Sequence, residues 1–219
     1  MMQEPIPIKT ERLAYWYFRL NGCATIENFI VHPEEGSAQE TEVDIIAIRF
    51  PFRAERLTNP MLDDEQVFPL DHRIKILLVE VKESRCGLNK SWRAPERRNM
   101  ERLVKAIGPF PEDMLKPVAH ELYATGSYKD SVFLMRLVCV GKEINLGIAN
   151  ERKGVLQLTW TQILDFICHR IKSYPAQKRS HQQWCHDGAY LYEQARLSTD
   201  GSELGRRIGL FEKLGPPSA

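Results

Sequence analysis

Several common sequence signals are missing from this chain of 219 residues. No apolar run approaches the ~20 residues that a transmembrane helix needs, and the first residues lack the basic and apolar stretches of a signal peptide. The sequence also contains no glycine-rich phosphate loop and no serine nucleophile elbow. It therefore gives no support to P-loop nucleotide hydrolysis or α/β-hydrolase chemistry, and we expect no membrane partner.

Cysteine is scarce as well and shows no pairing pattern. The five cysteines are widely spread, at positions 23, 86, 139, 168 and 185. An odd number of cysteines at such spacings predicts no disulfide framework and favours a reducing compartment. We therefore expect a cytoplasmic protein.

The net charge is only +1, but the charges are unevenly distributed along the chain. Between Glu27 and Asp44 there are six acidic residues and no Lys or Arg, whereas between Lys82 and Lys105 there are eight basic and three acidic residues. The basic segment is suited to contact a polyanion. The acidic segment could contact a polyanion only if metal ions lay between the two.

The hydrophobic pattern predicts an α/β protein. Residues 42–50 and 73–82 are apolar at nearly every position, which is typical of central strands covered on both faces. The connection between them, residues 51–72, is long for a compact domain and is typical of a functional or disordered loop. Other expected strands are 28–32, 131–140 and 155–159, and expected helices are 10–21 (with Thr10 as N-cap), 95–107, 115–123 and a helix capped by Thr159 or Thr161.

We divide the chain into two parts. Residues 1–175 form the expected domain, and residues 176–219 form a more polar C-terminal extension. In this extension we expect a helical piece around residues 184–196 and a frayed tail at the end.

Two of the expected strands carry the residues with the clearest chemical meaning. The strand 73–82 ends in Glu80-Val81-Lys82, and the strand before it carries Asp44. Glu80 and Lys82 share one face because residues two apart in a strand do so. If the strands are neighbours, two carboxylates and an ammonium group converge. Such a set suits Mg²⁺ or Mn²⁺ and the hydrolysis of phosphodiesters; the alternative is an ordinary strand end with solvated charges.

The order helix, strand, strand, strand, helix, strand, with Asp44 followed by Glu80-Val81-Lys82, resembles the PD-(D/E)xK nuclease superfamily. This superfamily has the restriction-endonuclease-like fold and includes archaeal Holliday-junction resolvases. The resemblance covers about residues 10–140, and Val43 stands where many members have proline. It implies a three-layer α/β core, with a mixed central sheet flanked by helices and here a C-terminal helical extension.

The resemblance also implies roles for individual residues. Asp44 and Glu80 would ligate Mg²⁺ (or Mn²⁺) with help from the Val81 carbonyl, and Lys82 would position the attacking water. Many members add an acid from the first helix, and Glu11 is the matching residue here. The alternative for Glu11 is a carboxylate that complements the helix dipole.

The basic segment next to this motif predicts a surface for the phosphate backbone of DNA. The helix expected at 95–107 carries Arg98, Arg102 and Lys105 on one stripe, and a solvated helix face with a buried tryptophan is the alternative. Trp92 is expected to stack on a base. The full set of expected contacts is Lys90, Trp92, Arg93, Arg97, Arg98 and Arg102.

Together these features predict a Mg²⁺-dependent endonuclease that acts on DNA. The sequence does not decide which form of DNA is cut, or whether the substrate is RNA instead. A homodimer is also open, because nucleases that cut both strands often work as dimers. One alternative is a catalytically silent protein of the same fold that binds nucleic acid or acts as an assembly subunit. Another is a small globular protein with a fortuitous Glu-x-Lys.

Overall fold

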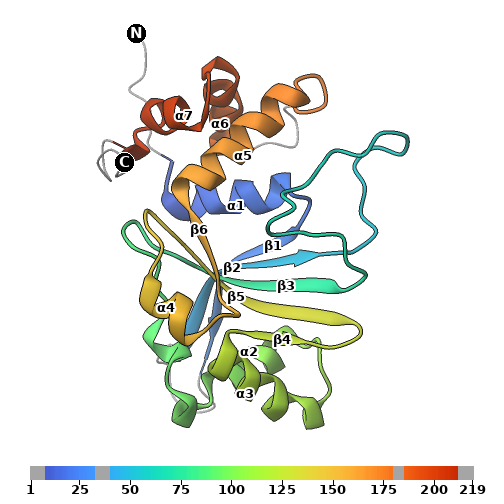
Figure 1. Cartoon of the computed structure of the whole chain (residues 1–219), viewed down its shortest axis with the longest axis vertical. Coiled ribbons are helices and arrows are strands. Elements are labelled where there is room, and N and C mark those ends of the chain that lie inside the picture. Colours follow the sequence, from blue (N-terminus) through green and yellow to red (C-terminus); the bar gives the residue numbers. More distant parts are fainter. Residues whose placement is uncertain (1–7, 33–39, 180–184, 212–219) are drawn as a thin grey trace.

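The computed structural model describes residues 8–32, 40–179 and 185–211. These residues form a six-stranded mixed β-sheet with helices on both of its faces (Figure 1). This arrangement confirms the predicted α/β class and the predicted mixed sheet flanked by helices.

The two apolar strands predicted to be central are neighbours in the sheet. Antiparallel pairs join β1 to β2, β2 to β3 and β4 to β5, whereas β3 and β6 both run parallel to β5. In order across the sheet, the strands are β1 (Ala24–Val31), β2 (Thr41–Arg49), β3 (Ile74–Val81), β5 (Phe133–Gly141) and β4 (Ser127–Lys129), and β6 (Leu156–Thr159) also pairs with β5.

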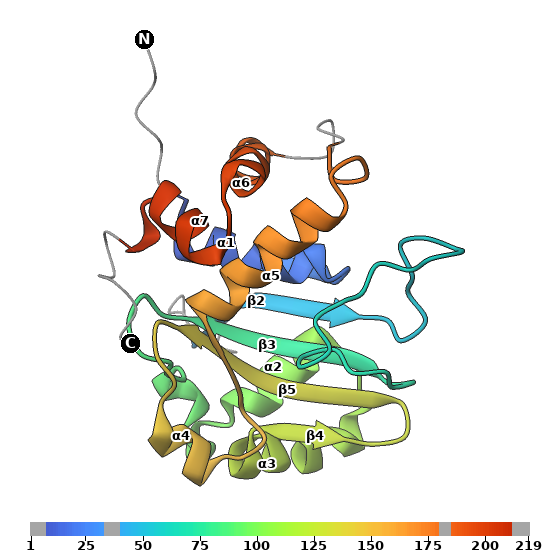
Figure 2. The ribbon, with the colours of Figure 1, turned by 45° about the horizontal axis from the view of Figure 1, so that its top comes forward.

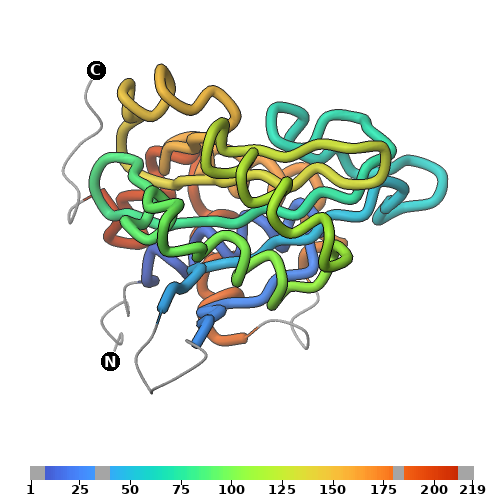
Figure 3. The backbone as a smooth tube through the Cα atoms, turned by 90° about the horizontal axis from the view of Figure 1, so that it is seen from below, coloured from blue at the N-terminus to red at the C-terminus, as the bar shows by residue number. Residues whose placement is uncertain are grey.

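The helices form one layer on each side of the sheet (Figures 1 and 2). Each layer has its own hydrophobic core against the sheet, which explains why β2 and β3 are apolar on both faces. Figure 3 shows the α2–α3 layer lying across the strands. One layer contains α1 (Thr10–Leu20), α5 (Trp160–Ser173), α6 (His186–Leu197) and α7 (Gly201–Arg207); the other contains α2 (Asn99–Ile107), α3 (Leu115–Thr125) and α4 (Leu146–Glu151).

The helix starts show how local sequence signals act. At α5, the side chain of Thr159 accepts from the backbone N–H of Gln162, and Gln162 bonds back to the backbone of Thr159. This capping box selects Thr159 over Thr161 as the cap. At α1 the prediction is wrong in detail, because Lys9 is the N-cap and Thr10 is already helical.

Other boundaries also differ from the prediction. Residues Pro95–Arg97 form a short 3₁₀ turn, Arg98 adopts a left-handed conformation with φ of 55°, and α2 begins only at Asn99. The strand expected at 28–32 begins earlier, at Ala24. The short elements β4, α4 and α7 were not predicted.

The C-terminal segment packs into the core of the domain. The helical piece expected around 184–196 coincides with α6. Buried side chains from α6, α7 and the residues after them join the core that also contains residues of α1 and α5; among them are Leu191, Tyr192, Leu204, Ile208 and Phe211. The expected frayed tail lies outside the described residues. None of the described helices has the length and apolar character needed to cross a membrane.

Candidate active site

The sheet ladder is interrupted at Asp44. Pairing between β2 and β3 ends at Ile45 and Val79, and pairing between β1 and β2 skips Asn28 and Asp44. Asn28 has a left-handed φ of 52°. Such backbone conformations cost free energy and cluster at functional sites. This irregularity could hardly be predicted, because its only signal in the sequence is the tolerance of asparagine for this conformation.

The carboxylate of Asp44 bridges the gap between the two strands. Its Oδ2 accepts a hydrogen bond of 2.7 Å from the backbone N–H of Val81. Asp44 therefore lies beside the residue that follows Glu80, on the neighbouring strand. This confirms that the two acids predicted to act together come from adjacent strands.

Glu80 is buried, with only 4% of its surface exposed. Its Oε1 forms an ion pair with the ammonium group of Lys82, which confirms that the two side chains share a face. Its other oxygen, Oε2, is buried and has no hydrogen-bond partner among the described residues. A buried carboxylate oxygen without a partner is unusual in a folded protein, because the loss of hydration is then uncompensated.

Burial and neighbouring charges act together on the two carboxylates. Burial raises the pKa of Glu80 to about 7, and the charges of Asp44 and Glu42 add to this effect while Lys82 opposes it. Burial also raises the pKa of Asp44, and the charges of Glu11 and Glu42 raise it further. The hydrogen bond from the Val81 N–H and the charge of Lys82 lower this pKa, but the net effect is a rise. The site is thus a region of concentrated negative charge.

The acid predicted from the first helix acts electrostatically on Asp44. Glu11 is half-buried in the first turn of α1, and its charge acts on Asp44. The same position also suits a carboxylate that complements the helix dipole. The structure therefore brings Asp44, Glu80 and Lys82 together, and Glu11 is near enough for its charge to act on Asp44.

The chemistry of these donors fits a hard divalent cation. Two carboxylates, one with an unpartnered oxygen, are oxygen ligands of the kind that Mg²⁺ and Mn²⁺ prefer. However, the described residues contain no cluster of three or more His, Cys, Asp or Glu side chains placed to hold a metal ion. A cation here would therefore depend on the Val81 carbonyl and on water as further ligands, as Mg²⁺ commonly does.

Lys82 is suited to remain protonated. Burial lowers its pKa, but the hydrogen bond and charge of Glu80, with Asp44 and Glu42, outweigh this effect and raise the pKa overall. About 40% of its side chain is exposed, so the ammonium group is accessible to a ligand. Lys82 is therefore better suited to stabilise negative charge than to act as a base.

The prediction that Trp92 stacks on a base is wrong. Its side chain is fully buried, and the indole Nε1 donates to Thr41 Oγ1 over 3.3 Å. Trp92 packs in the core on the α2–α3 side of the sheet. The structure therefore confirms the alternative, a buried tryptophan within a charged segment.

The predicted basic contacts fall into two groups. Arg98 lies before α2, so the predicted stripe of Arg98, Arg102 and Lys105 is wrong at its first member, and Arg98 pairs with Glu101. Arg102 pairs with Glu40, and Lys105 pairs with Glu112. The other group is exposed and makes no ion pair with any carboxylate that the structure describes; it contains Lys90, Arg93 and Arg97.

Arg93 belongs to the unpaired group, and its charge acts on the thiol of Cys139. Hydrogen bonding to Cys86 and burial raise the pKa of Cys139, and the Arg93 charge acts in the opposite direction. Cys139 is the β5 partner of Glu80 in the parallel ladder. Arg93 therefore places positive charge at the same end of the sheet as Glu80.

In comparisons with family models, curated proteins and solved structures, nothing matches this chain. Any assignment of function therefore rests on the geometry of the site itself.

Proposed function

We propose that the protein is a metal-dependent endonuclease that uses Mg²⁺ (or Mn²⁺) to hydrolyse phosphodiester bonds of DNA. The observation that carries this proposal is the state of Glu80. Its carboxylate is buried, one oxygen has no described partner, and Asp44 of the neighbouring strand adds a second negative charge. A divalent cation would supply both the missing partner and the missing positive charge.

In this proposal each residue of the site has a distinct task. Asp44, Glu80 and the Val81 carbonyl would hold the ion, which when bound supplies Lewis-acid activation of the phosphate and a more acidic water. Lys82 would keep its proton and stabilise charge on the scissile phosphate. Glu11 would accept a hydrogen bond from the attacking water and so orient it.

We also propose that the fold is the restriction-endonuclease-like fold of PD-(D/E)xK nucleases. The proposal is supported by Asp44 and Glu80 on adjacent strands, by Lys82 on the face of Glu80, and by Glu11 in the first turn of α1, whose charge acts on Asp44. Val43 remains the one departure from the motif in this region.

A catalytically silent protein of the same fold is the second candidate. It would bind nucleic acid or serve as an assembly subunit. The observation in its favour is that the described residues offer no third side-chain ligand in a ready metal-binding cluster. Cleavage assays distinguish the two candidates.

The test is incubation of the purified full chain with plasmid, single-stranded and branched DNA, in Mg²⁺, Mn²⁺ or EDTA. We expect cleavage in either metal and none in EDTA. Asp44→Ala, Glu80→Ala and Lys82→Ala should each reduce cleavage by about 10²-fold or more. Asp113→Ala, which changes an exposed acid before α3, is the matched control and should cleave normally.

Two outcomes would count against the proposal. Cleavage that persists at the same rate in all three variants would show that the activity does not come from this site. DNA binding without cleavage in either metal, by a chain with a native circular dichroism spectrum, would favour the silent candidate.

A further inference from the structure

A second concentration of buried charge lies at the opposite end of the β2–β3 hairpin. The last pair of this ladder places Arg49 directly opposite Lys75. They are only 8% and 3% exposed. Arg49 is five positions from Asp44, which corresponds to ~17 Å along a strand. Like charges directly opposite each other destabilise an antiparallel pair, so this arrangement needs compensation.

Arg49 has both carbonyl acceptors and a carboxylate within hydrogen-bonding reach. Its guanidinium donates to the carbonyls of Asn21, Phe50 and Arg53 and pairs with Asp63. The same Asp63 carboxylate also pairs with Arg170 at 3.1 Å and lies 3.5 Å from Arg53. Its single negative charge is therefore shared among three arginines, and none is left for another cation.

Lys75 lacks such compensation. Its ammonium group donates to the Pro69 carbonyl over 3.2 Å, and among the described residues no carboxylate is paired with it. Asp71 acts on it electrostatically but is bonded to Arg73 at 2.8 Å. Lysine is almost never fully buried unless it is paired. Lys75 is therefore a buried cation that forms no direct ion pair with any described carboxylate.

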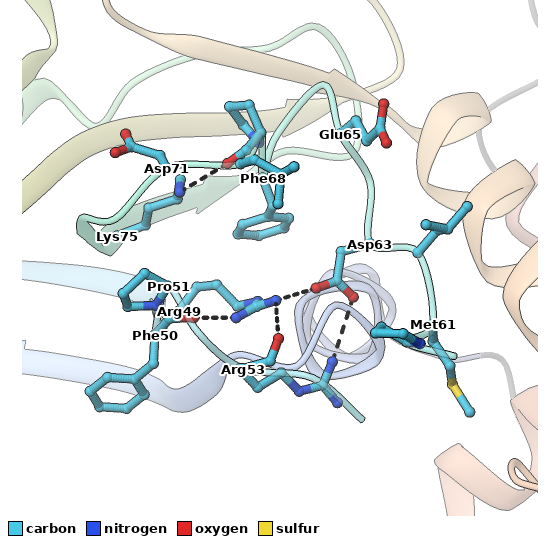
Figure 4. A pocket seen from close by; sticks show the side chains of 14 residues that line it. Arg49, Phe50, Pro51, Arg53, Met61, Asp63, Glu65, Phe68, Asp71 and Lys75 are labelled. Atoms are coloured by element: carbon cyan, nitrogen blue, oxygen red, sulfur yellow. Dashed lines mark hydrogen bonds and ion pairs between the residues drawn. The ribbon is translucent and has the colours of Figure 1, made fainter. Parts of the chain in front are cut away.

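This ammonium group lies in the wall of a cavity of about 190 Å³. Figure 4 shows Lys75 and Asp71 on one side of the cavity, Arg49 and Phe50 on the other, and the ring of Phe68 between them. The volume is below the ~300–1,000 Å³ of drug-sized sites, so an occupant would be small. Its lining combines aromatic and proline side chains with three basic and three acidic ones, and two of the acids, Asp63 and Asp71, are already paired with arginines.

We propose that this cavity is a binding site for a small organic anion, with a carboxylate or phosphate group held by Lys75 and a flat apolar body against Phe68. Burial lowers the pKa of Lys75, and a bound anion would favour its charged form. The site lies at the other end of the hairpin from Glu80. It does not depend on the proposed nuclease activity.

The test is a calorimetric titration of the full chain at pH 7 with phenyl phosphate, benzoate and benzamide. These probes share a benzene ring, and only benzamide is neutral. We expect at least one of the two anions to bind about tenfold or more tightly than benzamide, equivalent to about 1.4 kcal/mol. The tighter of the two anions identifies the preferred group, phosphate or carboxylate.

Variants locate the binding. Lys75→Met keeps most of the side-chain volume and removes an uncompensated buried charge, so it should fold with an unchanged or higher melting temperature. It should also lose the preference for anions over benzamide. Lys129→Met changes an exposed lysine on β4 and should keep this preference. Equal binding of all three probes, or an undiminished anion preference in Lys75→Met, would overturn the proposal.

Discussion

At the scale of single residues, the two carboxylates of the candidate active site are held in different ways. Asp44 accepts a backbone N–H from Val81 and so joins two strands where their ladder has ended. Glu80 is held by Lys82 alone, and its second oxygen gains nothing from the described protein. Asp44 therefore contributes to the fold, whereas Glu80 costs stability that only a ligand would recover.

This difference predicts how stability depends on pH without metal. The folded state holds the proton of Glu80 up to a pKa of about 7, above the usual value near 4.5. The free energy of unfolding should therefore fall as pH rises from about 4.5 to about 7, by a contribution on the order of 3 kcal/mol. Glu80→Gln should remove this contribution and be the more stable protein at pH 8.

Urea denaturation in EDTA at pH 5 and pH 8 measures the effect. Glu83→Gln changes an exposed acid nearby and serves as the control, because it should leave the difference between the two pH values unchanged. A Glu80→Gln protein that is less stable than the parent at pH 8 would show that its ion pair with Lys82 outweighs the cost of burial.

The facing of the site residues was predictable from the sequence, but the fate of Trp92 was not. The two-residue period of a strand and the order of the apolar runs suffice to place Glu80, Lys82 and Asp44. Trp92 is buried because its indole meets Thr41, which is 51 positions away in the sequence. A contact between residues so far apart leaves no signal in the local sequence. The same is true of the pairing of Arg49 with Lys75 on neighbouring strands.

At the scale of elements, strong local signals fixed the long helices and strands, whereas the missed elements depend on their surroundings. Strand β4 has three residues and exists through its pairing with β5. Helix α7 contains Gly201 and Gly205, which disfavour helix. Both are required by packing, because a Cβ would come within 2.3 Å of Asp165 at the first and 2.4 Å of Phe211 at the second.

The capping box of α5 gives a prediction at this scale. Thr159→Ala removes the side-chain acceptor for the Gln162 N–H and should lower the free energy of unfolding by about 1 kcal/mol. Thr161→Ala changes the exposed threonine inside the first turn and should alter it by less than about 0.5 kcal/mol. Chemical denaturation of both variants measures these changes. Equal losses of unfolding free energy would mean that the Thr159 cap makes no specific contribution.

The two groups of basic residues give another prediction, which rests on the proposed binding of DNA. The pair Arg93→Ala and Arg97→Ala should reduce the slope of log affinity against log salt by about 1.8, or 0.9 for each contact. Arg98→Ala with Arg102→Ala should reduce it less, because Glu101 and Glu40 already neutralise these side chains. Fluorescence anisotropy with duplex DNA in EDTA measures both slopes. A larger reduction in the variant that lacks Arg98 and Arg102 would place the DNA phosphate backbone along α2.

At the scale of the whole molecule, the segment after residue 175 contributes to the stability of the domain. Leu191 and Leu204 are fully buried in the core shared with α1 and α5, whereas Leu197 is 49% exposed. Leu191→Ala and Leu204→Ala should each cost about 2–5 kcal/mol. Leu197→Ala, the matched control, should cost much less. Urea denaturation distinguishes them, and losses as small as that of the control would show that this segment is only loosely attached.

The layer that contains α1 is built from segments far apart in the chain. Leu13, Tyr17 and Phe18 of α1 are buried together with residues of α5, α6 and α7, which come after residue 159. During synthesis on the ribosome, the α2–α3 layer can therefore be completed while one face of the sheet and α1 still lack their cover. Nascent chains that end before residue 160 should expose this apolar surface and bind holding chaperones, and release should follow once α5 to α7 have emerged.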